Sequence, residues 1–297
     1  MTAIPVPLPV REGVAPSYIW LPQGPWPDLL NFLTERFPAV DASQWQRRMQ
    51  AGDVRDARGS MLLPDAGYCA GMQVFYYREI AHEPPIPFDE FILYQDEHLL
   101  VADKPHFLPV TPSGRFLHET LLVRLKLKTG CDALVPIHRL DRETAGVVAF
   151  SLNPETRGRY QALFRERTVD KVYEALAPGR PDLSFPLTRR SRIIPGERFF
   201  MMKESGGEPN SHTEIEVLEK GLSCWRYRLR PSTGKTHQLR LHMLGLDMPI
   251  LNDLLYPVVH PVGAENYEKP LKLLARSLSF IDPVSGVRHC FESARTL

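Results

Sequence analysis

The chain has 297 residues, of which 43% are hydrophobic and 24% are charged. This length suggests two domains at about 150 residues each, and the large apolar content excludes an intrinsically disordered chain. The formal net charge is +1, from 36 Lys and Arg against 35 Asp and Glu, so the total alone gives no indication of a nucleic-acid-binding protein.

The first third of the chain is predicted to hold an arm, a small domain and a linker. Residues 1–25 are rich in proline, which fixes φ and donates no backbone hydrogen bond, so we expect an extended arm. Residues 26–80 are expected to form a small α/β domain. Its predicted elements are a helix that starts at Asp28 and stops at Pro38, a second helix over 42–51, and short strands over 53–77. The proline-rich run over 81–88 predicts a linker.

Residues 89–297 are predicted to form a second, larger domain. Its predicted strands cover 91–94, 99–102, 147–150, 171–177, 213–218 and 223–230, and its predicted helices cover 117–128, 153–167 and 236–244. A late hairpin turn is predicted over 282–286. Because most of these strands are joined by short turns, we predict an α+β fold with a mainly antiparallel mixed sheet.

Charge is distributed unevenly along the chain. Residues 1–100 hold 7 basic and 13 acidic side chains, residues 101–240 hold 24 and 16, and residues 241–297 hold 5 and 6. Affinity for a polyanion depends on a focused basic patch, so the middle segment is where we expect one. Two sets of arginines there could meet phosphates, although a solvated helix face explains the second equally well. They are Arg226, Arg228 and Arg230 on one predicted strand face, and Arg157, Arg159, Arg165 and Arg167 on one predicted helix.

Several classes of protein are excluded by missing motifs. Gly234-Lys235-Thr236 imitates the end of a phosphate-binding loop, but Leu229 stands where that motif needs glycine, so we expect no nucleotide cofactor. The four cysteines lie far apart without zinc-ligand spacing, which predicts reduced thiols and no metal. The N-terminus lacks the pattern of a signal peptide and no apolar run reaches 18 residues. We therefore expect a cytoplasmic protein without membrane contacts.

A dense polar loop over 138–146 lies between two predicted apolar strands. Composition alone fits a surface turn with compensating charges. A functional interpretation starts from Asp141, which lies between Arg139 and Arg142. Nearby positive charge would keep its carboxylate ionised, and an ionised carboxylate can act as a nucleophile or a base.

Two later segments change the balance between these interpretations. Lys171-Val172-Tyr173 places two functional side chains on one strand face, and Gly234 to His242 forms a basic turn before a helix. Together with His138-Arg139-Leu140-Asp141 and Thr144-Ala145-Gly146, these motifs resemble the RluA-type pseudouridine synthases in order and separation. The resemblance covers about residues 88–297.

The resemblance is incomplete at two loops and fainter at the front of the chain. The usual Asp-Thr-Ser-Gly is Glu143-Thr144-Ala145-Gly146 here, and the usual Gly-Asp-x-x-Tyr-Gly is Asn252-Asp253-Leu254-Leu255-Tyr256-Pro257. Residues 28–77 are similar to the small S4-like RNA-binding domain named after a ribosomal protein. The acidic balance of the front segment predicts that this domain contributes little to RNA binding.

The resemblance implies isomerisation of uridine to pseudouridine in structured RNA. Ribosomal RNA is the favoured substrate over transfer RNA. The nitrogen-to-sugar bond breaks, the uracil rotates, and carbon 5 bonds to the sugar, without redox chemistry, cofactor or metal. The implied partner is the RNA itself, and we expect a monomer. Base flipping is required, because the sugar of a stacked nucleotide is out of reach.

The resemblance also implies roles for individual residues. Asp141 is the implied nucleophile or base, Arg240 its ion-pair partner, and Tyr173 the residue against the uracil ring. Arg139 is implied to enter the space of the flipped base, and Leu241 to pack beneath the pocket. The remaining candidates for contact with substrate or for support of the site are His138, Arg142, Lys171, Thr236 and His237, with His242 as a further supporting residue.

Two other functions remain open on the residues alone. One is a non-catalytic RNA-binding or ribosome-assembly factor on the same scaffold, which would require a damaged catalytic set. The other is a small-molecule glycosidase, which needs a second carboxylate as acid. Only Glu143 is close to Asp141 in sequence, and it has the wrong strand parity if the loop is extended.

Overall fold

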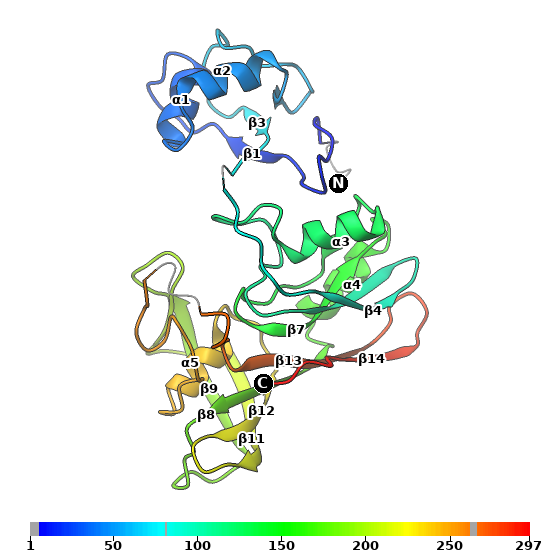
Figure 1. The fold of residues 1–297 in the computed structure, drawn as a ribbon, viewed down its shortest axis with the longest axis vertical. Coiled ribbons are helices and arrows are strands. Elements are labelled where there is room, and N and C mark those ends of the chain that lie inside the picture. Colours follow the sequence, from blue (N-terminus) through cyan, green and yellow to red (C-terminus); the bar gives the residue numbers. More distant parts are fainter. Residues whose placement is uncertain (1–5, 81, 262–265) are drawn as a thin grey trace. The chain divides into compact units, whose positions relative to one another are not determined.

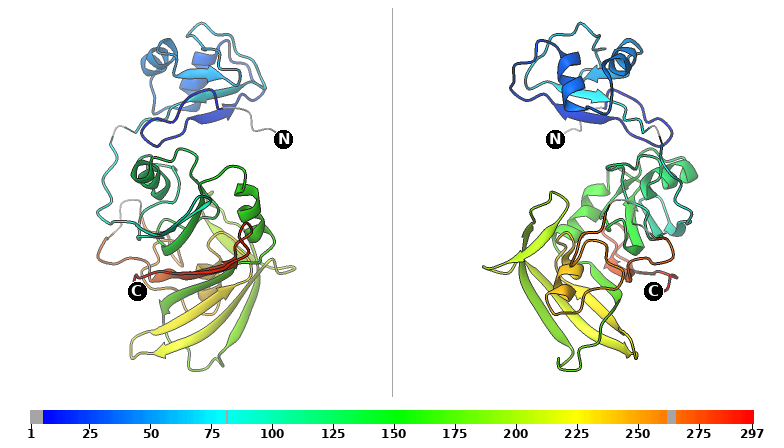
Figure 2. Two further views of the ribbon diagram at one scale, coloured as in Figure 1. Left: turned by 90° about the vertical axis from the view of Figure 1, so that its right-hand side faces the viewer. Right: turned by 60° about the vertical axis from the view of Figure 1, so that its left-hand side comes forward.

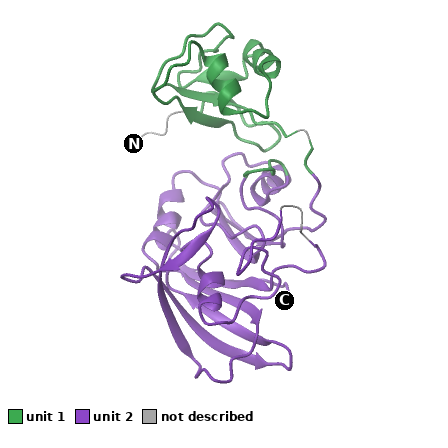
Figure 3. Ribbon diagram, turned by 90° about the vertical axis from the view of Figure 1, so that its left-hand side faces the viewer, with its two compact units in different colours: residues 1–83, 112–118 green, residues 84–111, 119–297 purple. Residues whose placement is uncertain are grey.

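The structure is a computed structural model that describes residues 6–80, 82–261 and 266–297. The chain divides into two compact units (Figure 3). Unit 1 comprises the described part of residues 1–83 together with 112–118, and unit 2 comprises 84–111 and the described part of 119–297. Among the described residues, no helix is both long and apolar enough to cross a membrane.

Unit 1 packs two short helices on a small antiparallel sheet with strand order β1-β3-β2 (Figure 1). Its elements are β1 (Ser17–Trp20), α1 (Leu29–Arg36), α2 (Ala42–Gln50), β2 (Val54–Asp56) and β3 (Gln73–Tyr76). Asp28 caps α1 by accepting the Asn31 N–H at 2.7 Å, as its position before the helical pattern predicts. Asp41 and Gln44 form a capping box on α2, and Trp45 lies in the apolar core between helices and sheet.

The prediction of an extended arm over 1–25 is only partly right. Residues 1–5 lie outside the described residues, but Ser17–Trp20 pairs with β3 and belongs to the sheet. Leu8 and Leu21 are buried, and the Tyr77 hydroxyl donates to the Pro9 carbonyl at 2.7 Å. The strand was not predicted because the prolines before residue 10 favoured an extended arm without strand pairing over the whole segment.

Unit 2 is built on one large mixed sheet with few helices, which confirms the predicted α+β class. The sheet has 11 strands, with the order β10-β9-β11-β12-β8-β13-β7-β5-β4, while β14 pairs with β13 and β6 with β7. The pairing of β7 with β13 is parallel and the other pairings of this sheet are antiparallel. The strands are β4 (Phe91–Gln95), β5 (Leu99–Lys104), β6 (Val135–Pro136), β7 (Ala145–Ser151), β8 (Asp170–Ala177), β9 (Leu187–Pro195), β10 (Met202–Ser205), β11 (Ser211–Lys220), β12 (Trp225–Pro231), β13 (Leu273–Ile281) and β14 (Arg288–Glu292).

The three helices of unit 2 are shorter than predicted. They are α3 (Leu121–Thr129), α4 (Arg157–Arg165) and α5 (Gln238–Leu244). Thr120 caps α3, so this helix begins four residues later than the apolar pattern indicates. His237 has a left-handed backbone with φ 56°, so α5 begins after it and Thr236 lies in the preceding turn. The predicted turn over 282–286 is confirmed, since Asp282 accepts the Val284 and Ser285 N–H groups between β13 and β14.

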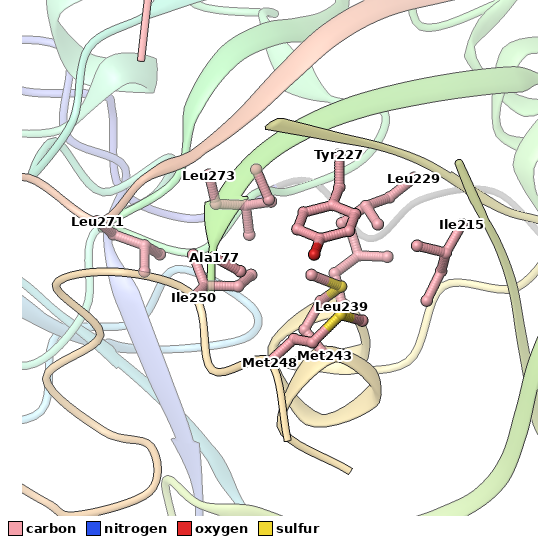
Figure 4. Packing of buried hydrophobic residues seen from close by; sticks show 11 residues of the cluster. Ala177, Ile215, Tyr227, Leu229, Leu239, Met243, Met248, Ile250, Leu271 and Leu273 are labelled. Carbon is pink, nitrogen blue, oxygen red and sulfur yellow. The ribbon is translucent and has the colours of Figure 1, made fainter. Parts of the chain in front are cut away.

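Helix α5 lies beside the large sheet (Figure 2). A continuous apolar cluster packs the helix against the strands. Leu239 and Met243 of α5 meet Ile215 of β11 and Tyr227 of β12 in this cluster (Figure 4). The polar side of α5 is thereby turned toward the loop that precedes β7, where Arg240 contacts Asp141. The core therefore fixes the position of the site.

Candidate active site

The loop over 138–144 enters β7 through a glycine that no other residue can replace without strain. Gly146 has φ 113°, and a Cβ added there would lie 2.1 Å from the Ala275 carbonyl oxygen of β13. The Thr144 N–H donates to the Asp141 carbonyl at 3.1 Å and closes a turn. Asp141 is thus held on a tight loop against the sheet, with 26% of its side chain exposed.

A buried lysine supports the same loop from β5. The Nζ of Lys104 donates to the carbonyls of Pro105, Leu108 and Arg142 at 2.8–3.0 Å. Burial lowers the pKa of Lys104 to about 7, but three carbonyl acceptors match the three N–H groups of the ammonium, so we assign the charged form. Sequence reasoning gave Lys104 no role, although it stands in the Asp103-Lys104-Pro105 segment that the family resemblance includes.

Arg240 has two acidic partners in the site and a third nearby. Its side chain is fully buried and forms a bidentate pair with Asp253, with Nε–Oδ2 at 2.7 Å and Nη2–Oδ1 at 2.5 Å. Its Nη1 lies 3.4 Å from Asp141 Oδ2, and 3.9 Å from Glu143. Burial by itself lowers the pKa of Arg240, but Asp253, Asp141 and Glu143 together raise it, so the guanidinium stays charged. The structure therefore brings Arg240 to Asp141 and adds Asp253, which sequence reasoning treated only as part of a divergent loop.

Tyr173 and Lys171 lie on one face of β8, as their spacing predicts. Burial raises the pKa of the Tyr173 hydroxyl, and the negative charge of Asp141 raises it further, so this hydroxyl remains a proton donor. Lys171 donates to the Thr233 carbonyl at 3.3 Å, at the turn that leads to α5. Burial lowers the pKa of Lys171. Lys171 therefore contacts the turn, while Tyr173 lies within the electrostatic reach of Asp141.

His237 and Tyr256 connect the site to the β9–β10 hairpin. The Nε2 of His237 lies 3.9 Å from Asp141 Oδ2, and its Nδ1 lies 2.8 Å from the Tyr256 hydroxyl. Burial lowers the pKa of His237 even though Asp141 opposes this shift. The Tyr256 hydroxyl also accepts the Met202 N–H at 2.9 Å, and the ring packs with Leu241. Tyr256 was missed as a site residue because its position in sequence reveals none of these contacts.

The other two histidines of the motifs support the fold. His138 accepts the Ala149 N–H at 3.1 Å and stacks on Phe164, with 4.6 Å between ring centroids. Burial lowers the pKa of His138 to about 3, so the ring is a neutral acceptor. His242 contacts Ser191, Ser211 and Thr213, and burial lowers its pKa to about 4.

The remaining predicted residues lie at the surface or in ion pairs. Arg139 and Thr236 are exposed, and in the described part of the chain neither has a side-chain hydrogen bond or ion pair. Arg142 pairs with Glu143 at 3.0 Å. Burial opposes ionisation of Glu143, but Arg142 and Arg240 outweigh it and lower the pKa of this carboxyl. Arg139 is therefore the free cation beside Asp141 in sequence.

The predicted arginine face of β12 is not a free basic surface. Arg228 pairs with Glu216 at 3.1 Å, and Arg226 lies 3.9 Å from Glu174. Arg230 stands opposite Glu214 in the register of β11 and β12. On α4, Arg157 is half-buried and donates to the Ala133 carbonyl, so it does not share the exposed side of Arg159, Arg165 and Arg167. Arg226, Arg228 and Arg230 do share one face of β12, as predicted, but two of them lie near glutamates, and the prediction that Arg157 lies on the exposed side was wrong.

Groups of His, Cys, Asp or Glu suited to a metal ion are absent from the described residues. What the site presents is a carboxylate and a buried arginine, with a protonated tyrosine nearby. Such a set can attack or deprotonate a sugar and hold the negative charge that results, which is acid–base and nucleophilic chemistry.

Comparison with known proteins defines the class. A family model described as RNA pseudouridylate synthase matches residues 98–244. The human RNA pseudouridylate synthase domain containing 1 shares the fold with a TM-score of 0.57 and 27% identity, over 70% of this chain and 85% of that one. The fold and the site thus define an RNA pseudouridine synthase.

Two relatives show which family of RNA pseudouridine synthases the chain resembles. A dual-specificity RNA pseudouridine synthase RluA of Haemophilus influenzae is 33% identical over 223 residues, which are 72% of this chain and 97% of the relative. A ribosomal large subunit pseudouridine synthase D of Pseudomonas aeruginosa is 31% identical over 219 residues, 68% of this chain and 67% of the relative. The chain belongs to the RluA-type RNA pseudouridine synthases.

Proposed function

We propose that this enzyme converts a specific uridine of ribosomal RNA to pseudouridine, with Asp141 as the reacting carboxylate. The observation that carries this proposal is the convergence of Asp141, Tyr173 and Arg240, which come from three separate segments of the chain. The choice of ribosomal RNA rests on the relative that is named for the large ribosomal subunit.

Asp141 acts on the ribose by one of two routes. In the first, its carboxylate attacks the anomeric carbon and expels the uracil through the nitrogen-to-sugar bond. In the second, it removes the neighbouring ribose proton to the same end. The uracil then rotates and its carbon 5 bonds to the anomeric carbon. In the first route this displaces the Asp141 carboxylate and breaks its bond to the sugar, and in the second Asp141 returns the proton to the ribose. Carbon 5 loses its proton and the ring nitrogen gains one, so the reaction is balanced without a co-reactant. Arg240 orients the Asp141 carboxylate and offsets its negative charge in both routes.

Tyr173 and Arg139 complete the proposed mechanism. Tyr173 lies against the uracil ring and takes part in the movement of the carbon 5 proton. Its hydroxyl is protonated, because burial and Asp141 both raise its pKa. Arg139 is exposed and fills the space that the flipped base leaves in the RNA.

Release of tritium from carbon 5 of labelled uridine tests this function. With ribosomal RNA transcribed in vitro, the wild-type enzyme is expected to release tritium and Asp141→Asn to release none, while both bind the RNA equally. Deuterium at the ribose carbon 2 separates the two routes, because only proton removal from that carbon gives a primary isotope effect. Tritium release by Asp141→Asn at the wild-type rate would disprove the role of Asp141.

We infer further that unit 1 is the S4-like domain and that the enzyme acts as a monomer. Two capped helices followed by short strands support the first inference. Sedimentation tests the second, with a single species of about 34 kDa expected from the chain mass.

A further inference from the structure

The β9–β10 hairpin carries an aromatic tip that the fold does not use. Phe199 is 99% exposed and Phe200 is 39% exposed, between Arg198 and Met201. The two rings meet edge to face, with 5.3 Å between centroids. Fully exposed phenylalanine is unfavourable in water, so a tip of this kind indicates a surface that is covered when a partner binds.

One face of the same hairpin carries uncompensated positive charge. Arg190 and Arg192 alternate along β9, and the register of β9 with β10 places Lys203 on their side. All three side chains are exposed, and none takes part in the ion pairs of the described residues. The nearest acid on β10 is neutralised, because Glu204 pairs with Arg189 at 2.5 Å. This face differs from that of β12, where Arg226 and Arg228 lie 3.9 Å and 3.1 Å from glutamates.

A polar hollow lies along this basic face. It has a volume of about 410 Å³, and its lining includes Arg190, Arg192 and the glycines at 206 and 207, together with the paired Arg189 and Glu204. Gly207 has φ 114°, and a Cβ there would lie 2.8 Å from an Arg192 guanidinium nitrogen. The glycine therefore leaves room for Arg192 to lie at the hollow, where a phosphate group would meet two guanidinium groups.

The base of the hairpin is joined to the proposed catalytic loop. Met202 is hydrogen-bonded to the Tyr256 hydroxyl, which contacts His237, whose ring lies 3.9 Å from Asp141. Ile193 of β9 packs in one apolar cluster with Leu241 and Tyr256. Phe199 is three residues from Met202, and three extended residues span about 10 Å. RNA with a uridine at Asp141 can therefore reach the tip.

We propose that the β9–β10 hairpin is an RNA-binding element, in which Phe199 stacks on an unpaired base near the target uridine while Arg190, Arg192 and Lys203 contact the adjacent phosphates. This proposal rests on the proposed function, since RNA is the occupant of the site. Aromatic rings that stack on splayed bases beside a basic track are the usual means of binding unpaired RNA. Because an aromatic ring can stack on any base, the hairpin would add affinity for unpaired nucleotides near the target uridine without selecting a particular base.

Measurements of RNA binding and of single-turnover rates together test whether the β9–β10 hairpin binds RNA. For Phe199→Ala, the enzyme concentration that gives half the maximal rate on transcribed ribosomal RNA is expected to rise about tenfold, with the rate at saturation unchanged within twofold. Phe199→Trp is expected to retain wild-type affinity and Phe199→Leu to behave as alanine, because only an aromatic ring stacks. Arg192→Glu is expected to weaken binding about tenfold and to reduce the salt dependence of log Kd by about one phosphate contact.

Leu222→Ala is the matched control, since this side chain is fully exposed at the β11–β12 turn. It is expected to bind as wild type does. Filter binding in the Asp141→Asn background keeps the test independent of turnover, so a failure of the proposed reaction and a failure of the hairpin are seen separately. Equal Kd values for the Phe199→Ala and Leu222→Ala proteins in that background would overturn the proposal.

Discussion

At the residue scale, the buried Arg240 positions the partly exposed carboxylate of Asp141. Asp253 holds the guanidinium in a bidentate pair, and one remaining nitrogen faces Asp141 at 3.4 Å. The longer contact leaves Asp141 free to react, because a tight bidentate pair would occupy both of its oxygens. Planar, two-pronged recognition of this kind is specific to arginine.

Replacing Arg240 by lysine should therefore impair the reaction although the charge is kept. An ammonium group cannot bind both oxygens of Asp253 in parallel and also reach Asp141. We expect the single-turnover rate to fall about 100-fold, which corresponds to about 2.7 kcal/mol in the barrier. Asp253→Asn should lower the rate in the same way, and circular dichroism verifies folding of both variants. A rate for Arg240→Lys within threefold of wild type would contradict this role.

At the element scale, the parallel pairing of β7 with β13 fixes the loop that carries Asp141. Gly146 is where the two backbones meet. Gly146→Ala should cost about 3 kcal/mol in the free energy of unfolding, because it combines backbone strain with a clash against a carbonyl. Urea unfolding measures this. Gly158→Ala in α4 is the matched control, since an added Cβ there meets nothing within 4 Å, and it should stabilise the protein slightly. Equal effects of the two substitutions would refute the argument.

The link between His138 and β7 predicts a pH dependence. The pKa of His138 is about 3 in the folded protein and about 6.5 when unfolded, so the unfolded chain binds the extra proton between these values. Stability from this residue is therefore complete above pH 6.5 and lost as the pH falls toward 3. From pH 7 to pH 5, wild type should lose up to about 2 kcal/mol relative to His138→Gln, which can also accept the Ala149 N–H. Urea unfolding at both pH values measures the difference, and a constant difference would contradict the prediction.

Most elements of the fold could be predicted from sequence, because their signals are local. Asp28, Asp41 and Gly130 mark helix ends through their own side chains or backbone freedom. β1 was missed because it pairs with β3, which lies far away in the chain. β9 and β10 were missed although they are neighbours in the chain, because their polar, arginine-rich sequences show no clear apolar alternation. In the candidate site, local motifs predicted Asp141 and Arg240. Asp253 and Tyr256 could not be predicted in this way, because they act through tertiary contacts.

At the scale of the whole molecule, positive charge is concentrated where RNA is proposed to bind. In unit 1, Arg48 pairs with Glu79, and Arg55 donates to the Gly52 and Gly59 carbonyls. Only part of its small basic complement is thus available to phosphates. The net charge of +1 therefore conceals a local basic surface on the β9–β10 hairpin.

Reversing the charge of three exposed arginines of unit 1 should have little effect on RNA binding. A triple variant with glutamate at Arg36, Arg47 and Arg58 should keep Kd for ribosomal RNA within about twofold of wild type at physiological salt. The matched comparison is Arg190→Glu with Arg192→Glu, which should weaken binding more than tenfold. A loss of more than tenfold in the unit 1 variant would show that this unit binds the RNA strongly.

Asp141 and the RNA substrate are central to the proposed function, and mapping of pseudouridines in cells tests both at once. In cells that lack this protein, one ribosomal RNA site should remain uridine. Wild-type protein should restore the pseudouridine at that site, and Asp141→Asn should not, although it is present in equal amount and binds ribosomal RNA. Restoration by Asp141→Asn, or a pseudouridine map of ribosomal RNA that does not depend on the protein, would contradict the account.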